Sequence, residues 1–376
     1  MKGQMAMPNE SLYHQGDIYF DGLLEDIEAA TSRIDLETYI FRIDRVGRRF
    51  VRALIRAAER GVRVRLMVDG VGLPFTSQNL PQMFDGSAVQ IRIYHPIPWF
   101  FWHWKYTSQD RPLLRKLIDW LINLNHRNHR KTCVIDNKIA WVGSFNICDC
   151  HLPVALGGEG WRDSAVKLLG VDIYPLSRAF EKAWHAHRLM PPFPPWRDFP
   201  FRLNYTRYRR RRLLRDLIRR IERTQKRLWI TNAYFVPDRL LLRKLAQAAH
   251  RGIDVRILLP ERSDVFFMPW TSSVFYRQLL LTGVRIYEYQ PAILHAKTII
   301  IDDWMTVGSS NLNYRSLLHD LEVDVVLQQS SSKQNLASQF LADIQNAREI
   351  SLAFYPPRPW WQRRIAMLIL ILERWL

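Results

Sequence analysis

The chain has 376 residues, which is too long for one ordinary hydrophobic core and suits two domains of similar size. Lys and Arg outnumber Asp and Glu by 54 to 36, so the formal net charge is +18, which argues against a cationic or neutral partner and favours nucleic acid or anionic lipid. The 14 Trp and 18 Phe residues favour a membrane interface over nucleic acid.

The segment from Met1 to Tyr13 contains one lysine and no apolar core of signal-peptide length, so we expect no export. Three cysteines, Cys133, Cys148 and Cys150, form no paired framework, which favours a reducing compartment. The run from Cys148 to His151 resembles part of a metal site, but no second pair at ligand spacing completes a tetrahedron. We therefore expect neither a metal ion nor a cofactor.

Hydrophobic spacing predicts alternating strands and helices in the first half. A strand over Ile34 to Phe41 precedes a helix, a second strand follows Gly61, and a third covers Val89 to Tyr94. The apolar positions that predict the helix are Phe50, Val51, Leu54, Ile55 and Ala58. Strands that alternate with helices indicate an α/β lobe with a largely buried sheet.

The second half repeats this order. The run from Glu59 to Val68 is echoed by His250 to Leu259, and further strands are predicted over Leu228 to Phe235 and Val284 to Tyr289. The chain is therefore expected to fold into two similar α/β lobes.

Proline marks the boundary between the lobes, because residues 191–200 contain five prolines, which exclude regular structure. We expect a first lobe over residues 1–190, a linker over 191–200 and a second lobe over 201–376. Only the first lobe carries an insertion, at about residues 95–128, which is rich in Trp, Phe and helix-forming apolar residues.

A duplicated motif carries the chemistry. Its first copy consists of His129, Lys131, Asp136, Ser144 and Asn146. Its second copy consists of His295, Lys297, Asp302, Ser309 and Asn311. One copy alone would be typical of a surface or structural pair, whereas matched spacing in both halves indicates a shared site.

These residue types suit a phosphodiester. A His and a Lys two residues apart on a strand point to the same face, so two facing lobes would gather two imidazoles, two ammonium groups and two amides. The lysines and asparagines can stabilise charge on the phosphate oxygens. One neutral histidine can attack phosphorus, while the other, protonated, serves the leaving oxygen and later deprotonates the acceptor.

At both positions and in full, the motifs resemble the paired His-x-Lys-x4-Asp signature of the phospholipase D superfamily. The run from Gly283 to Leu327 is most similar to bacterial cardiolipin synthases. The resemblance implies two phospholipase D-like lobes, each a mixed sheet flanked by helices, with the active site between them. It also implies that His129 is the nucleophile and His295 the general acid.

An acidic residue follows each motif just before an apolar strand, Asp163 in the first half and Glu322 in the second. The resemblance implies that these carboxylates orient the histidines, which fits the need to fix a tautomer. The alternative is that both are solvated charges at strand ends. Asp136 and Asp302 are expected to brace the site from outside it.

Three segments are candidates for membrane contact. The arginine-rich segment from Arg207 to Arg227 predicts an amphipathic helix whose Leu and Ile face either enters a membrane surface or packs on the second lobe. Aromatic residues in Pro96 to Leu124 predict docking on a bilayer, as do Trp360, Trp361 and the amphipathic segment from Ile365 to Leu376, unless that last segment is buried.

The sequence therefore predicts a cardiolipin synthase that transfers a phosphatidyl group to phosphatidylglycerol through a phosphohistidine. The alternatives are a phospholipase D-type phosphodiesterase, either a phospholipid hydrolase or a nuclease, and a binding module without catalysis. Expected partners are phosphatidylglycerol, phosphatidylethanolamine as a second candidate, and an anionic membrane surface rather than nucleic acid. We expect peripheral association with the cytoplasmic side of the bacterial inner membrane.

Overall fold

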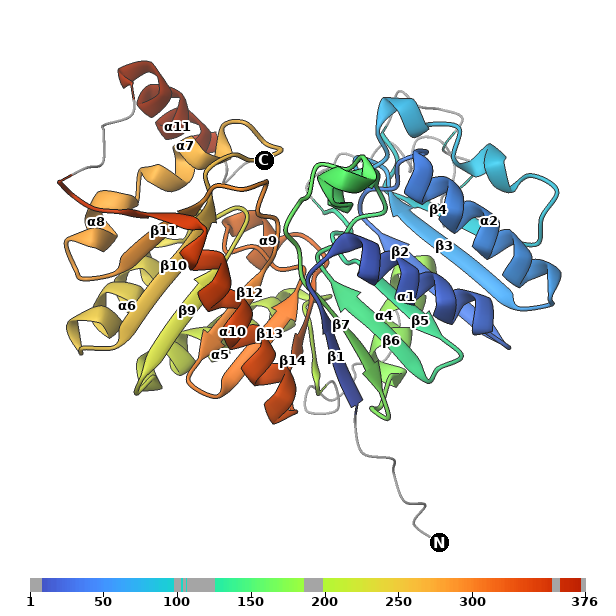
Figure 1. The fold of residues 1–376 in the computed structure, drawn as a ribbon, viewed down its shortest axis with the longest axis horizontal. Coiled ribbons are helices and arrows are strands. Elements are labelled where there is room, and N and C mark those ends of the chain that lie inside the picture. The colour runs from blue at the N-terminus through green and yellow to red at the C-terminus, as the bar shows by residue number, and fades with distance from the viewer. Residues whose placement is uncertain are drawn as a thin grey trace, which may run out of the picture.

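A computed structural model describes residues 9–97, 103, 106, 126–185, 199–353 and 359–372. The described chain forms two α/β lobes that lie side by side, the first on the right and the second on the left of Figure 1. This confirms the predicted fold class. Most of the predicted insertion and residues 191–198 of the predicted linker lie outside the described residues.

The first lobe is built on a mixed sheet whose described strands have the order β1-β7-β6-β5-β2-β3-β4. Only β2, β3 and β4 run parallel to one another, and the other neighbours are antiparallel. The strands are β1 (Asn9–Tyr13), β2 (Arg33–Thr38), β3 (Arg63–Asp69), β4 (Gln90–Tyr94), β5 (Thr132–Ile135), β6 (Ile139–Gly143) and β7 (Ala165–Leu169). The helices are α1 (Gly16–Ala29), α2 (Arg45–Glu59) and α4 (Tyr174–His185).

The second lobe repeats the plan with the order β15-β11-β10-β9-β12-β13-β14-β8, in which β9, β10 and β11 are parallel. Its strands are β8 (Phe201–Leu203), β9 (Arg227–Thr231), β10 (Asp254–Pro260), β11 (Arg285–Tyr289), β12 (Thr298–Ile301), β13 (Trp304–Gly308), β14 (Val323–Val326) and β15 (Ala347–Ile350). Its helices are α5 (Arg207–Arg223), α6 (Arg239–His250), α7 (Met268–Ser273), α8 (Tyr276–Leu280), α9 (Tyr314–Leu318), α10 (Ser330–Gln345) and α11 (Trp360–Leu372).

The echo between the two halves has a local cause. Asp44 and Asp238 each accept a backbone N–H at the start of α2 and α6, which is the role of an N-cap residue. Both helices are followed by a glycine with positive φ, Gly61 at 86° and Gly252 at 83°. Glycine adopts this left-handed conformation without the steric cost of a side chain, so it ends the helix and turns the chain into β3 or β10.

One hydrophobic cluster joins the lobes. Buried side chains of β6 and β7 in the first sheet, such as Val142 and Val166, share this cluster with side chains of β13 and β14 in the second, such as Val307 and Val323. Arg162 adds an ion pair across the junction to Asp343 on α10, with 2.8 Å between the charged atoms. The shared core fixes how the two lobes face each other.

Helix α5 resolves the alternative left open for the arginine-rich segment. Its residues Leu217, Ile218 and Ile221 are buried in the core of the second lobe. The membrane hypothesis for this apolar face is therefore wrong, because the face is already covered by protein. The helix also ends at Arg223, before the predicted limit at Arg227, where β9 begins.

Candidate active site

Both histidine motifs lie at the junction of the lobes. His129 and Lys131 lie just before β5, and His295 and Lys297 just before β12, so the expectation that they lie on strands is wrong. The lysines fold back on their own segments, since Lys131 Nζ donates to the His129 carbonyl oxygen at 2.7 Å and Lys297 donates to that of His295. The structure thus brings the His and Lys of each motif together.

Each histidine is held by a carboxylate from the opposite lobe. His129 Nδ1 lies 3.0 Å from Glu322 Oε1, and His295 Nδ1 lies 3.0 Å from Asp163 Oδ1. Ionised carboxylates only accept hydrogen bonds, so Nδ1 carries the proton and Nε2 is left for chemistry. Both carboxylates are buried, which excludes the alternative that they are solvated strand ends.

Backbone bridges support these crossed contacts. The His129 N–H donates to the Leu321 carbonyl at 3.0 Å, directly beside Glu322. The His295 N–H donates to the Arg162 carbonyl at 2.8 Å, directly beside Asp163. Each histidine segment is thereby fixed against the acidic segment of the other lobe.

The motif asparagines line the same region in a matched way. Asn146 Oδ1 accepts from the Ile40 N–H at 3.2 Å, and Asn311 Oδ1 accepts from the Tyr234 N–H at 3.3 Å. Since each side-chain oxygen is used in this way, the amide nitrogen is the end that can donate to a bound phosphate.

The motif serines support the backbone and the acids. Ser309 Oγ donates to Glu322 Oε2, and Ser144 Oγ donates to the Ser164 carbonyl at 3.1 Å.

Asp136 and Asp302 act away from the histidines. Asp136 accepts from the backbone N–H groups of Thr31, Ser32 and Arg33, just before and at the start of β2. Asp302 accepts from the backbone N–H groups of Gln225, Lys226 and Arg227, just before and at the start of β9. Both therefore anchor a sheet end rather than the reacting groups.

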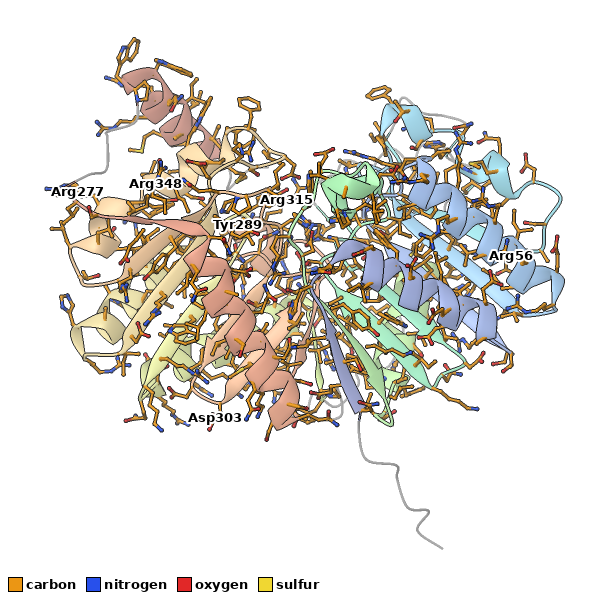
Figure 2. The ribbon with its side chains drawn as sticks, viewed as in Figure 1. Arg56, Arg277, Tyr289, Asp303, Arg315 and Arg348 are labelled. Atoms are coloured by element: carbon orange, nitrogen blue, oxygen red, sulfur yellow. A yellow bond between two sulfur atoms is a disulfide. The ribbon has the colours of Figure 1, made fainter. Side chains whose placement is uncertain are left out.

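Burial and charge set the protonation of the site. Burial, with Lys131 and Lys297, holds the pKa of His129 well below its usual range. Burial also lowers the pKa of Lys131 to about 7 and that of Lys297 to about 8. Arg315, labelled between the lobes in Figure 2, adds positive charge near His129. The free site is thus short of negative charge and suited to a phosphate anion.

The two acids differ. Burial raises the pKa of Glu322 to about 7. Burial acts on Asp163 in the same direction, but His295 and His151 outweigh it and hold the pKa of Asp163 well below its usual range. Burial and Lys297 lower the pKa of His295, against the opposing effect of Asp163.

Several residues at the site were not predicted from the sequence. The Tyr39 ring lies 5.0 Å from that of His129, and the Tyr234 ring lies 6.1 Å from that of His295. His151 Nδ1 lies 2.9 Å from Asp163 Oδ2, and Ser316 donates to Glu322. His151 and Ser316 occupy the same position after the motif asparagines, and this matched spacing is the signal that could have found them.

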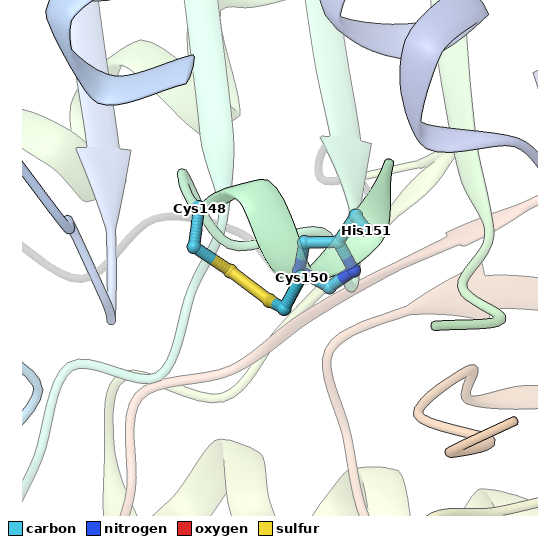
Figure 3. Close-up of side chains that lie close together, drawn as sticks. All are labelled: Cys148, Cys150 and His151. Atoms are coloured by element: carbon cyan, nitrogen blue, oxygen red, sulfur yellow. A yellow bond between two sulfur atoms is a disulfide. The ribbon is translucent and has the colours of Figure 1, made fainter. Parts of the chain in front are cut away.

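The expectation that the cysteines form no pair is wrong. Cys148 and Cys150 are joined by a disulfide, whereas Cys133 is free and buried. The two bonded cysteines are separated by one residue, so the bond closes a very short loop (Figure 3). Among the described residues, Cys148, Cys150 and His151 are close enough to share a metal ion, but the disulfide consumes both thiols and both His151 nitrogens face protein partners.

No helix in the described ranges is both long enough and apolar enough to cross a membrane.

The C-terminal helix α11 combines apolar residues with two arginines. It lies on the surface, and the side chain of Trp360 is 76% exposed. The alternative that this segment is buried in the core is therefore wrong for residues 360–371, apart from Ala366.

Residues 23–150 and 217–344 match a family described as cardiolipin synthase, PLD-like domain. A cardiolipin synthase of Listeria welshimeri is 28% identical over 371 residues, which cover 95% of this chain and 73% of that protein. A cardiolipin synthase of Clostridium perfringens is 29% identical over 364 residues, which cover 92% of this chain and 72% of that protein.

Solved structures share the fold. Phosphatidylserine synthase from Haemophilus influenzae superposes with a TM-score of 0.66 at 13% identity, covering 97% of this chain and 93% of its own. Polyphosphate kinase from Porphyromonas gingivalis superposes with a TM-score of 0.62 at 14% identity, and the match covers 98% of this chain and 54% of that chain. At such identities the likeness concerns the arrangement of the two lobes alone.

The depressed lysine pKa values generate a prediction about pH. Since Lys131 has a pKa of about 7 and Lys297 of about 8, both lose their charge as pH rises through this range. A phosphodiester anion binds the charged forms, so kcat/KM for a soluble diester should fall above about pH 7. The fall in kcat should begin at higher pH, because a bound phosphate raises both pKa values.

Lys131→Arg is the matched variant, because a guanidinium stays charged throughout this range. It should move the first fall in kcat/KM to higher pH. A flat kcat/KM profile between about pH 6 and pH 9 would contradict the assigned lysine charges.

Proposed function

Because this chain belongs to the family of cardiolipin synthases with PLD-like domains, we propose that it moves a phosphatidyl group from one phospholipid onto the glycerol hydroxyl of phosphatidylglycerol, forming cardiolipin. The observation that carries the proposal is the crossed pair of contacts, His129 with Glu322 and His295 with Asp163. Two oriented imidazoles beside two lysines support a transfer in two displacements at one phosphorus.

In the first displacement, His129 Nε2 bonds to the phosphorus of the donor lipid. The bond from phosphorus to the leaving oxygen breaks, and His295 gives its Nε2 proton to that oxygen. Lys131, Lys297 and the asparagine amides stabilise charge on the remaining phosphate oxygens. A phosphatidylglycerol donor thereby releases glycerol and leaves its phosphatidyl group on His129.

In the second displacement, the acceptor hydroxyl gives its proton to His295, which is now neutral. The acceptor oxygen bonds to phosphorus as the bond to His129 breaks, so both histidines return to their starting states. Two molecules of phosphatidylglycerol yield one cardiolipin and one glycerol. Water as acceptor would give phosphatidic acid instead, so exclusion of water from the site decides the product.

The product can be identified with doubly labelled phosphatidylglycerol, carrying one label in its acyl chains and another in its terminal glycerol. Cardiolipin should retain the acyl label, and one labelled glycerol should be released for each cardiolipin formed. Turnover should persist in EDTA, because lysine and asparagine side chains supply the charge stabilisation. If phosphatidic acid were the main product at every acceptor concentration, the protein would be a phosphodiesterase instead.

The second candidate lipid is tested by replacing the phosphatidylglycerol donor with phosphatidylethanolamine.

The intermediate can be located by mass spectrometry. His129→Ala should remove turnover, and His295→Ala should reduce it by at least about 10²-fold, since it removes the acid and base of both steps. Protein quenched in denaturant at neutral pH should carry phosphatidyl on His129. His250→Ala, on an exposed helix end, is the control and should behave as the unchanged protein. An adduct on His295 would reverse the assigned roles.

An apolar surface beside the site supports attachment to a membrane. It consists of the exposed residues Phe266, Trp360, Trp361, Met367, Leu368 and Ile371. Helix α11, at the upper left of Figure 1, carries all of these residues except Phe266, which lies two residues before α7. The rings of Trp270 and Trp361 pack edge to face with 5.4 Å between their centroids, which joins α11 to α7. Arg363 and Arg364 are exposed on the same helix and can contact anionic headgroups.

The position of this apolar surface fits delivery of lipid. Asp264, two residues before Phe266, accepts a hydrogen bond from the Tyr234 hydroxyl at 2.6 Å, and the Tyr234 ring flanks His295. Exposed aromatic rings in contact with headgroups stabilise binding by about 25 cal/mol per Å² of buried apolar surface. The chain would therefore lie on a phospholipid surface with its active site beside the lipids.

Changing Trp360, Trp361 and Leu368 together to Ser should weaken sedimentation with phosphatidylglycerol vesicles by at least about tenfold. Turnover of a short-chain soluble diester should be unchanged, because none of the three residues touches the site. Ile18→Ser on α1, which replaces a side chain that is 55% exposed on the first lobe, is the control for loss of apolar surface. Equal vesicle binding by all three proteins would reject this surface as the membrane contact and turn attention to residues 96–124.

A further inference from the structure

His151 and Ser316 occupy equivalent places in the two lobes. His151 Nε2 accepts a hydrogen bond from the Asn146 N–H at 3.1 Å, and Ser316 Oγ accepts one from the Asn311 N–H at 2.8 Å. Each then faces the carboxylate of its own lobe, His151 toward Asp163 and Ser316 toward Glu322. The duplicated site therefore has a matched third position behind each acid.

The side chains at this position differ between the lobes. Glu322 accepts from the hydroxyls of Ser309 and Ser316 and contacts His129. Asp163, one methylene shorter, is met by a longer partner and lies between two imidazoles, with His295 on Oδ1 and His151 at 2.9 Å from Oδ2. The His151 Nδ1 and Asp163 Oδ2 atoms are in contact, although their relative geometry is not that of a regular hydrogen bond.

The partners of His151 determine which of its ring nitrogens carries the proton. Because Nε2 accepts from a backbone N–H, the proton of the neutral ring is on Nδ1, toward Asp163. Rings of Phe145 and Trp161 pack against the imidazole with centroids at 5.2 and 5.6 Å, and its side chain is fully buried. Burial among aromatic rings fixes the orientation of the imidazole, with Nε2 toward the Asn146 N–H and Nδ1 toward Asp163.

This arrangement makes the two acids unequal partners. The pKa of Asp163 is held well below its usual range despite burial, whereas that of Glu322 is raised to about 7 by burial. An ionised Asp163 favours an imidazolium at His295, while Glu322 supports a charge on His129 less well. Among the other charged groups, Lys297 opposes the proton on His295 and Asp264 favours it.

We propose that His151 is a positioning residue that acts through Asp163 to reserve the role of general acid for His295. It touches neither substrate nor phosphorus, and it works by keeping a fixed, ionised carboxylate against His295 Nδ1. The inference rests on the proposed two-histidine reaction, in which the proton on His295 Nε2 passes to the leaving oxygen as the bond from His129 to phosphorus forms.

The decisive variant is His151→Phe, which keeps a ring against Phe145 and Trp161 but removes both polar contacts. Single-turnover release of the first alcohol should be measured with two soluble diesters, one with an alkyl leaving group and one with 4-nitrophenol. Release of the alkyl alcohol should slow by about tenfold or more, because that oxygen needs a proton. Release of 4-nitrophenolate should change little, because this anion leaves unprotonated.

Two variants control for structural damage. His151→Gln can accept from the Asn146 N–H and donate to Asp163, so it should restore release of the alkyl alcohol. Ser316→Ala removes the equivalent contact to Glu322 and should slow both diesters alike, because it acts on the nucleophile. An equal loss on both diesters in His151→Phe would overturn the proposal.

A second measurement does not depend on turnover. The titration of His295, followed by NMR in protein with labelled histidine, should move to lower pH in His151→Phe and return in His151→Gln. An unchanged His295 titration would overturn the proposal whatever the rates show. A protein that forms no cardiolipin but shows the leaving-group effect and the shifted titration would refute the proposed product and retain the role of His151.

Discussion

The crossed contacts between each histidine and a carboxylate of the other lobe are the constraint on which the site depends. Neither lobe alone can orient its own histidine, since the partner of His129 is Glu322 and the partner of His295 is Asp163. A rotation of one lobe would break both contacts at once. The shared hydrophobic cluster between the sheets and the bridge from His295 to Arg162 therefore serve chemistry as well as stability.

Charge at this junction is arranged for a ligand that the free protein lacks. Burial lowers the pKa values of both lysines, so their charged forms are destabilised until a phosphate anion lies between them. Binding of the anion then restores their protons and contributes stabilisation that develops with the substrate. A lipid phosphate would complete the charge balance of the site, whereas water alone would not, and this links affinity to the same two side chains that stabilise the displacement.

Much of this fold and site could be predicted because the information is local and duplicated. Strand and helix spacing indicated both α/β lobes, and the repeated His-x-Lys spacing indicated the reacting groups. The pairing of acids with histidines could not be predicted from local spacing, because His129 and Glu322 are 193 residues apart and meet only through the packing of the lobes. The sequence offered no role for His151 beyond a cysteine-containing metal cluster that lacked the ligands to be complete, whereas in the fold the ring turns toward Asp163. The apolar face of α5 shows the same limit, since periodicity predicted the helix but could not identify protein as its covering.

Duplication within one chain also explains how two histidines with the same motif can differ. In an assembly of two identical lobes, each histidine would meet the same acid and the same residue behind it, so neither would be distinguished as acid or nucleophile before substrate binds. A single chain that carries both lobes can place His151 and the shorter Asp163 behind one imidazole, and Ser316 and the longer Glu322 behind the other. In each lobe a residue and an acid together link the backbone to the catalytic ring, with a long residue and a short acid in one lobe and the reverse in the other. The two pairs differ in the charge that they place behind the ring. The approximate symmetry of the lobes thus places both histidines at one phosphorus. The difference between the residues behind the two acids gives each histidine a separate role.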